Sequence, residues 1–170
     1  MRQSEQQSRA FAEIVKHYSE PLYWKIRQFV LLHEDADDVL QNTFIKAWKS
    51  FDSFRGDSSL STWLHRIAIN ESLDLLRRKK ENQSLDSTQA GGVVRTLMAD
   101  SYFDGDEAEA QLLAAVQELP EVQQMVFNLR YFHDMSYQEI SQITHTTEGA
   151  LKASYHIAVK KITEKLSNKD

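Results

Sequence analysis

The sequence predicts an all-α protein in which two small helical domains are joined by a flexible linker. Apolar residues recur at steps of three and four over most of the 170 residues, as they do on one face of a helix. The two prolines and five glycines are too few for the many turns of a β-sandwich or barrel. The periodicity stops between residues 81 and 106, which divides the helical pattern into two parts.

Three helices are predicted in residues 1–80, the first domain. The first helix covers about residues 8–32, and Pro21 is expected to bend or interrupt it. The second begins near Asp35, where a run of carboxylates favours the positive end of a helix dipole. A loop at residues 51–61 leads into the third helix, which ends near Lys80. The predicted buried stripes are Phe11, Ile14, Val15, Tyr18, Leu22, Ile26 and Phe29; Val39, Leu40, Thr43, Phe44, Ala47 and Trp48; and Leu60, Trp63, Leu64, Ile67, Ala68 and Leu75.

Charge is unevenly distributed along the chain. The net charge is −5, and residues 81–106 alone hold one basic and five acidic residues. Because this segment is also polar and without periodicity, we predict that it is an acidic, flexible linker. By contrast, residues 149–170 contain five lysines and only two acidic residues. A phosphate backbone responds to the local field, so the acidic total does not exclude nucleic acid as a partner.

The second domain is predicted at residues 107–170 and contains a helix-turn-helix pattern. Pro120 fits the first turn of a helix, and Ser136 and Glu139 have the spacing of a capping box at the start of the next one. A three-residue turn then leads to a last helix that begins near Thr147. Its predicted buried stripe is Leu151, Tyr155, Ala158, Ile162 and Leu166.

Several kinds of chemistry find no support in the sequence. The chain has no cysteine, which excludes disulfides, thiolate metal sites and thiol catalysis. Its six histidines lack metal-binding spacing, and the glycine motifs of nucleotide sites and the nucleophile elbow are absent. We therefore expect a non-catalytic protein with no metal and no cofactor. No apolar run has the length of a membrane span, and the polar beginning is unlike a signal peptide, so we expect a cytoplasmic protein without membrane insertion.

The last helix is a candidate for recognition of duplex DNA. Glu148, Lys152 and His156 step by four, so they share the free face early in the helix, where a recognition helix meets base edges. Lysines further along suit phosphate contacts. The alternative is an ordinary pair of bundle helices, because a short turn between two helices occurs in many proteins. The full candidate set is Thr147, Glu148, Lys152, His156, Lys160 and Lys161.

A second candidate site combines the loop at residues 52–61 with the free face of the helix that follows. Aromatic rings stack on unpaired bases, and an asparagine amide reads base edges, so the composition suits single-stranded nucleic acid. The alternative is that the aromatic residues belong to the core and that the basic run at 77–80 is a solvated helix end. The candidate residues are Phe54, Arg55, Ser59, Trp63, Arg66, Asn70, Arg77 and Arg78.

The second helix leaves a polar face with one apolar residue in it, formed by Asp37, Asp38, Gln41, Asn42 and Ile45. Such a face suits docking of another protein. The alternative is an ordinary solvated helix face.

The order of these segments resembles the extracytoplasmic-function (ECF) group of bacterial RNA polymerase sigma factors. The resemblance covers about residues 10–80 and 107–166. It rests on the sequences DADDVLQNTFIKAW, FRGDSSLSTWLHRIAIN and SYQEISQITHTTEGALKASYHIAVKKI. It implies a sigma-two domain at residues 1–80 and a sigma-four domain at residues 107–170.

The resemblance also implies partners. The helix carrying Asp38, Gln41 and Phe44, with Asn42 and Ile45 beside them, would dock on the clamp helices of the largest subunit of core RNA polymerase. The sigma-four domain would meet the flap of the second-largest subunit. An anti-sigma factor is a further expected partner.

Promoter DNA is the remaining implied partner. The loop from Phe54 to Ser61 would capture a flipped-out base of the −10 element, and Asn70 would help to read that element. The last helix would enter the major groove at the −35 element. Ala150, Ser154 and Ile157 stand where the family frequently has a threonine and two arginines, so the recognition helix is less basic than usual.

Two other functions remain open from the sequence. A stand-alone helix-turn-helix regulator would bind duplex DNA without polymerase, and a helical interaction module would not bind nucleic acid at all. Run-off transcription with core polymerase distinguishes these functions from that of a sigma factor.

Overall fold

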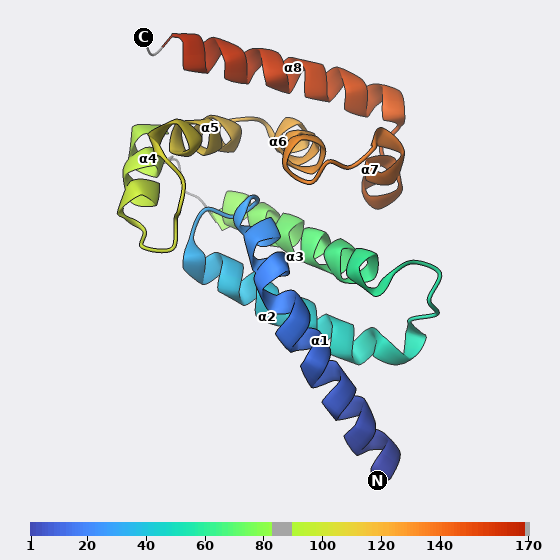
Figure 1. The fold of residues 1–170 in the computed structure, drawn as a ribbon. Coiled ribbons are helices and arrows are strands. Elements are labelled where there is room, and N and C mark those ends of the chain that lie inside the picture. Colours follow the sequence, from blue (N-terminus) through green and yellow to red (C-terminus); the bar gives the residue numbers. More distant parts are fainter. Residues whose placement is uncertain (83–89, 169–170) are drawn as a thin grey trace. The chain divides into compact units, whose positions relative to one another are not determined.

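A computed structural model describes residues 1–82 and 90–168, and every regular element in those ranges is a helix (Figure 1). The all-α prediction is therefore confirmed. The chain divides into two compact units, residues 1–81 and 82–170, and each is described by itself. Within the described ranges, no helix has both the length and the apolar character needed to cross a membrane.

Unit 1 is a helical bundle. It contains α1 (Arg2–Arg27), α2 (His33–Ser50), the 3₁₀ helix η1 (Phe51–Ser53) and α3 (Leu60–Asn82). Helix α1 packs against α2, and the periodic apolar residues of all three helices supply the core. The buried members of that core are Leu22, Ile26, Phe29, Val30, Ala36, Val39, Ala47, Leu64, Ala68 and Ile69.

The bounds of α1 differ from the prediction at both ends. The helix begins at Arg2, because the polar residues before Ser8 favour helix although they carry no apolar stripe to reveal it. It ends at Arg27, and the connection that follows is buried at Phe29 and Val30. The prediction was that Pro21 bends or interrupts the helix, and the interruption is wrong. The helix continues through this exposed residue, and its next turn is held by burial of the apolar stripe.

Unit 2 packs its last helix across the preceding ones. It contains α4 (Ala90–Ala99), α5 (Glu107–Gln117), α6 (Glu121–Phe127), the π-helical stretch η2 (Asn128–Phe132), α7 (Tyr137–Thr144) and α8 (Glu148–Ser167). Helix α8 contacts α5, α6 and α7. Their shared core is formed by Ala115, Val116, Leu119, Phe127, Ala158 and Ile162.

Helix α4 corrects the prediction for residues 81–106, which were expected to form a linker without helix. Val93 and Leu97 of α4 are buried, and the helix packs against α5. Its sequence contains two glycines and is only ten residues long, so its local preference for helix is weak. Tertiary packing therefore stabilises it. Residues 83–89 of the predicted linker lie outside the described residues.

Candidate nucleic-acid interface

The loop before α3 has a defined conformation at both ends. Gly56 adopts a left-handed backbone conformation with φ of +75°, which side-chain-bearing residues rarely adopt. The Ser59 hydroxyl accepts a hydrogen bond of 3.1 Å from the backbone N–H of Thr62 and lies 2.8 Å from its hydroxyl oxygen. Ser59 therefore caps α3, and the loop enters the helix at a fixed angle.

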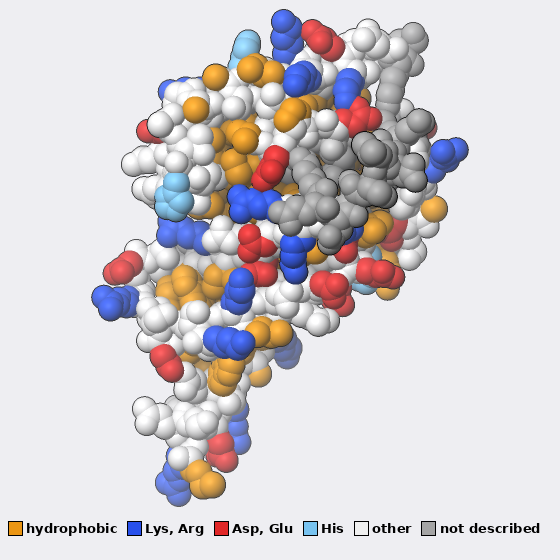
Figure 2. Space-filling view, turned by 180° about the vertical axis from the view of Figure 1, so that it is seen from behind, with side chains coloured by type: hydrophobic (Ala, Val, Ile, Leu, Met, Phe, Trp, Pro, Cys, Tyr) orange, Lys and Arg blue, Asp and Glu red, His pale blue; other side chains and the backbone are white. Residues whose placement is uncertain are grey.

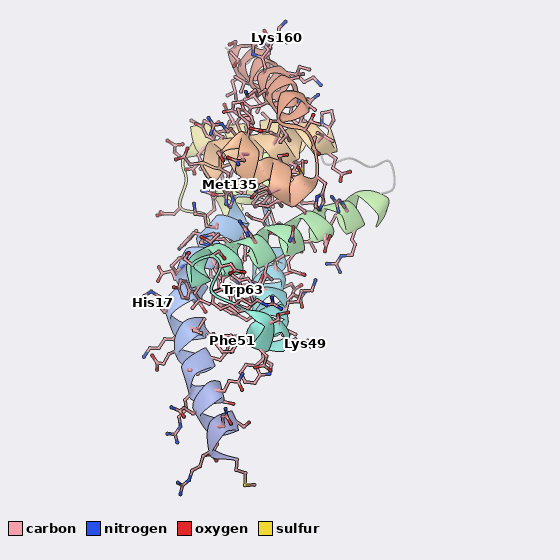
Figure 3. The ribbon with its side chains drawn as sticks, turned by 90° about the vertical axis from the view of Figure 1, so that its right-hand side faces the viewer. His17, Lys49, Phe51, Trp63, Met135 and Lys160 are labelled. Atoms are coloured by element: carbon pink, nitrogen blue, oxygen red, sulfur yellow. The ribbon has the colours of Figure 1, made fainter. Side chains whose placement is uncertain are left out.

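The two aromatic candidates of the loop region contact each other. The ring centroids of Phe54 and Trp63 lie 4.9 Å apart, with the ring planes tilted by 36°. Both side chains are half-buried, so each is partly core and partly surface. Trp63 lies at the start of α3, close to the loop (Figure 3). The aromatic pair therefore supports the loop and still presents ring surface to solvent. It is partly core and partly available to an unpaired base, which were the two alternatives that the sequence left open.

The other candidates form a strip along α3. Arg55, Arg66 and Asn70 are exposed, as are Arg77 and Arg78 further along the helix. At 1.5 Å per residue, the strip from the capped start to its last arginine is about 27 Å long. Such a strip suits an extended strand of several nucleotides better than a single base in a pocket.

Arg77 and Arg78 both contact an acidic residue on the same helix. The Arg77 guanidinium lies 3.8 Å from the Asp74 carboxylate, and Arg78 Nε donates to the Asp74 backbone carbonyl at 3.4 Å. The Asp74 carboxylate therefore compensates part of the charge of Arg77, whereas the contact of Arg78 is with a backbone carbonyl.

Two ion pairs join α3 to α2. Lys46 of α2 pairs with Glu71 of α3, and Asp35 of α2 pairs with Lys79 of α3. The pKa of Lys46 is raised, chiefly by its hydrogen bond to Glu71. The pairs lie about three turns apart along α2, so they connect the two helices at two separate levels.

The predicted docking face of α2 is exposed. Asp38, Gln41, Asn42 and Ile45 are all solvent-accessible, and Phe44 is half-buried. The face is therefore available to a partner, as a docking surface requires.

An apolar groove lies beside this face. It is open, has a volume of about 410 Å³, and is lined by Ser8, Phe11, Ala12, Phe44, Ile45 and Trp48. Trp48 was predicted to be buried, but it is 42% exposed. The Phe11 ring lies 5.0 Å from that of Trp48 and 5.9 Å from that of Phe51. The spacing of Phe44 and Trp48 on α2 is visible in the sequence, whereas the approach of Phe11 from α1 is not.

The helix-turn-helix of unit 2 is held by local hydrogen bonds. The Ser136 hydroxyl accepts a hydrogen bond of 3.1 Å from the Glu139 N–H, which confirms Ser136 as the N-cap of α7. The Glu139 carboxylate accepts from the Ser136 hydroxyl at 3.1 Å, in place of the bond to the Ser136 backbone N–H that a full capping box has. His145 ends α7 in the left-handed conformation, with φ of 58°. The Thr147 hydroxyl caps α8 by accepting from the Ala150 N–H at 3.3 Å. The turn therefore has the geometry that places a second helix at a defined angle.

All six candidates for duplex recognition are exposed on α8 or at its start: Thr147, Glu148, Lys152, His156, Lys160 and Lys161. Lysine and arginine side chains are visible around α8 at the top of Figure 2. Lys160 points away from the rest of unit 2 (Figure 3). Lys165, on the same helix, pairs instead with Glu118 at the end of α5.

The described side chains offer no metal-binding cluster. In residues 1–82 and 90–168, no three histidine or acidic side chains come together as a metal ion would require. The exposed strip of α3, the groove and the outer face of α8 are therefore the candidate functional surfaces.

Comparison with known proteins relates both units to one family. The chain matches the family model "Sigma-70 region 2" over residues 14–82 and "Sigma-70, region 4" over residues 109–162. The ECF RNA polymerase sigma factor SigW of Bacillus subtilis is 31% identical over 156 residues, which cover 86% of this chain and 83% of SigW. The RNA polymerase sigma-H factor of Pseudomonas aeruginosa is also 31% identical, over 85% of this chain and 80% of its own length.

A solved structure supports the fold. The sigma factor RpoE from Bartonella quintana, in complex with the anti-sigma factor NepR, matches with a TM-score of 0.68 at 21% identity. The match covers 93% of this chain and 97% of RpoE. At this identity the likeness concerns the fold.

Proposed function

Because the chain belongs to the extracytoplasmic-function family of RNA polymerase sigma factors, we propose that its two units divide promoter recognition between them. The protein is an alternative sigma factor that directs promoter-specific transcription. Unit 1 docks on core RNA polymerase and recognises the −10 element, and unit 2 recognises the −35 element. The protein acts in the cytoplasm as a non-catalytic subunit.

The −10 assignment depends on one observation above all, the exposed strip that continues from an aromatic-supported loop along α3. Phe54 and Trp63 offer ring surface to an unstacked base, and Arg55 and Arg66 offer positive charge to the strand. Asn70 is exposed in the same strip, where its amide reads a base edge. At the distal end, Arg77 contacts the DNA backbone more weakly, because the Asp74 carboxylate compensates part of its charge.

The −35 assignment rests on the exposed face of α8. Glu148, Lys152 and His156 lie early in the helix and reach base edges, whereas Lys160 and Lys161 lie further along and contact phosphates. Thr147 caps the helix and directs its N-terminal end toward the groove of the DNA.

Core docking is assigned to the face of α2 formed by Asp38, Gln41, Asn42, Phe44 and Ile45. The partner surfaces are the clamp helices of the largest polymerase subunit for unit 1 and the flap of the second-largest subunit for unit 2. The groove next to the α2 face supplies the apolar surface that a stable interface needs at its centre. An anti-sigma factor is a further partner, as NepR is for RpoE of Bartonella quintana.

Run-off transcription with purified core polymerase tests the assignment. The templates carry single base substitutions in the −10 and −35 elements. We expect Asn70→Ala to relax preference at one −10 base by about 1–3 kcal/mol, the contribution of a good base contact, and to leave the −35 ranking unchanged. An identical −10 ranking for wild type and Asn70→Ala would remove the base-reading role of Asn70. Absence of transcription with wild-type protein would exclude the sigma function of this chain on those promoters.

A further inference from the structure

Tyr137, the first residue of α7, lies next to two cations. The Arg130 guanidinium carbon is 4.8 Å from the centroid of the Tyr137 ring, and the Lys152 ammonium nitrogen is 5.8 Å from it. Both distances fall within about 6 Å, the range in which a cation is attracted by the negative face of an aromatic ring. The same ring thus links the stretch before α7 to the early part of α8.

The ring itself is held in place. Arg130 donates a hydrogen bond of 3.0 Å from Nη1 to the backbone carbonyl of Met135, just before α7. Tyr155 of α8 meets the Tyr137 ring edge-on, with centroids 6.3 Å apart and planes at 71°. Tyr155 packs against the core of unit 2, and its pKa is raised first by burial and then by Tyr137. The ring therefore has a defined position before any ligand arrives.

The Tyr137 ring lies beside the ammonium group of Lys152. Its side chain is exposed, and within the described ranges no carboxylate forms an ion pair with its ammonium group. A free lysine side chain loses about 2 kcal/mol of rotamer entropy when it is fixed in one conformation. Contact with the Tyr137 ring restricts the ammonium group beforehand, which lowers the cost of binding a defined atom. Lys160 and Lys161 have no such ring beside them in the described part of the chain.

We propose that Tyr137 is a positioning residue that determines specificity at the −35 element by orienting Lys152 toward one base edge. This inference rests on the proposed role of Lys152 as a base contact. A lysine in a restricted position distinguishes guanine O6 and N7 from the atoms of other bases, whereas a mobile lysine reaches neighbouring phosphates equally well. Lys160 and Lys161, which are not restricted in this way, contribute affinity without base preference.

The test uses full-length protein bound to core polymerase and a set of duplex promoters with each −35 base pair substituted in turn. Four variants are compared with wild type: Lys152→Ala, Tyr137→Leu, Tyr137→Phe and the control Tyr131→Leu. Tyr131 is an exposed aromatic residue of the same unit, and within the described ranges no cation lies over its ring. Relative affinities are obtained by competition binding.

We expect Lys152→Ala to reduce base preference at one or two −35 positions. Tyr137→Leu should reduce preference at those same positions by about twofold to fivefold, the size of an exposed cation–π contact, and should have no further effect in a Lys152→Ala background. Tyr137→Phe retains the ring and should keep the wild-type profile. Tyr131→Leu should also keep it.

Two outcomes separate the failure of this inference from failure of the proposed function. If Lys152→Ala changes base preference and Tyr137→Leu does not, or if Tyr137→Leu weakens all duplexes equally, the positioning role is wrong. If Lys152→Ala leaves every preference intact, Lys152 is not a base contact and the assignment on which the inference rests is wrong.

Should Tyr137→Leu fail to fold, fluorinated phenylalanine at position 137 keeps the ring volume and removes its negative face. Loss of preference with increasing fluorination is then the expected result, and an unchanged profile contradicts the proposal.

Discussion

The ammonium group of Lys46 on α2 pairs with the carboxylate of Glu71 on α3, and Glu71 is only 5% exposed. Lys46 itself remains largely exposed, so its side chain reaches the buried carboxylate from the surface. Glu71 is adjacent to Asn70, the proposed base-reading residue, whereas Lys46 follows Ile45 on the proposed docking face. The pair therefore joins α2 to α3 next to Ile45, which is proposed to dock on polymerase, and Asn70, which is proposed to read a base.

Removal of Lys46 should destabilise unit 1. In Lys46→Ala the Glu71 carboxylate stays buried without its partner, and an unsatisfied buried polar group costs about 1–3 kcal/mol. The control is Lys49→Ala, which removes an exposed lysine from the same helix and should change the free energy of unfolding by less than about 0.5 kcal/mol. Urea unfolding followed by circular dichroism measures both. Equal stability of the two variants would show that the pair contributes nothing.

The same pair predicts a dependence of stability on pH. The pKa of Lys46 is raised above its ordinary value of 10.5, first by the hydrogen bond to Glu71, which outweighs the lowering effect of burial. A lysine whose pKa is raised by folding stabilises the folded state, and this contribution is complete below 10.5, its ordinary value. The contribution is lost as the pH rises through the higher pKa of the folded state. The stability difference between wild type and Lys46→Ala should therefore be constant near pH 8 and shrink above about pH 10.5. A difference that grows in alkali would have the wrong sign.

Trp48 should be an anchor of the interface with core polymerase. Its ring is 42% exposed in the groove, and exposed tryptophans at the centre of an interface often contribute about 2 kcal/mol or more. Trp48→Ala is expected to weaken binding to core polymerase by about thirtyfold, as measured by fluorescence anisotropy. Trp24 is 45% exposed on α1 and lies outside the groove, so Trp24→Ala is the matched control. Similar losses for both tryptophans would argue against the groove as the docking centre.

Local signals predicted where both helices of the helix-turn-helix begin. The cap at Ser136 and the start of α8 at Thr147 each depend on a few consecutive residues, so a single sequence contains the necessary information. The exposed face of α8 follows from its 3.6-residue period for the same reason.

The features that were missed depend on distant residues. Helix α4 has a weak local preference for helix and is stabilised by burial of Val93 and Leu97 against α5. Periodicity correctly places Trp48 on the apolar side of α2, but it gives no information on how far the neighbouring helix covers that side. Phe11 of α1 contacts Trp48 at the ring edge and does not cover it, so Trp48 lines an open groove.

Two glycines should respond in opposite ways to alanine. Gly56 has φ of +75°, and no atom lies within 4 Å of the place that a Cβ would occupy, so Gly56→Ala strains only the backbone, by about 1–2 kcal/mol. Gly149 lies in α8 with equally open surroundings, and Gly149→Ala should stabilise the helix by up to about 1 kcal/mol. Thermal unfolding measures both effects, and a shift of the same sign for the two variants would contradict the prediction.

The functional consequence of Gly56→Ala should be confined to promoter melting. Because the strain falls on the loop that precedes α3, the variant should open −10 DNA more slowly in a permanganate footprint while its affinity for core polymerase stays unchanged. Normal opening by a destabilised Gly56→Ala protein would show that the loop conformation has no part in melting.

Lys161 and Lys165 should differ in their effects on DNA binding, although they lie one turn apart on α8. Lys161 is exposed and is assigned to phosphate, so Lys161→Ala should weaken all −35 duplexes equally and reduce the salt slope of log affinity by about one. The Lys165 ammonium pairs with Glu118 of α5, so part of its charge is already compensated within unit 2. Lys165→Ala should therefore change the salt slope less and lower stability by at most about 1 kcal/mol, as expected for a surface pair.

Binding of holoenzyme to one duplex over a range of salt concentrations measures both slopes. Equal reductions for the two variants would mean that Lys165 leaves Glu118 to contact phosphate, and a base-dependent loss for Lys161→Ala would place Lys161 among the residues that read sequence.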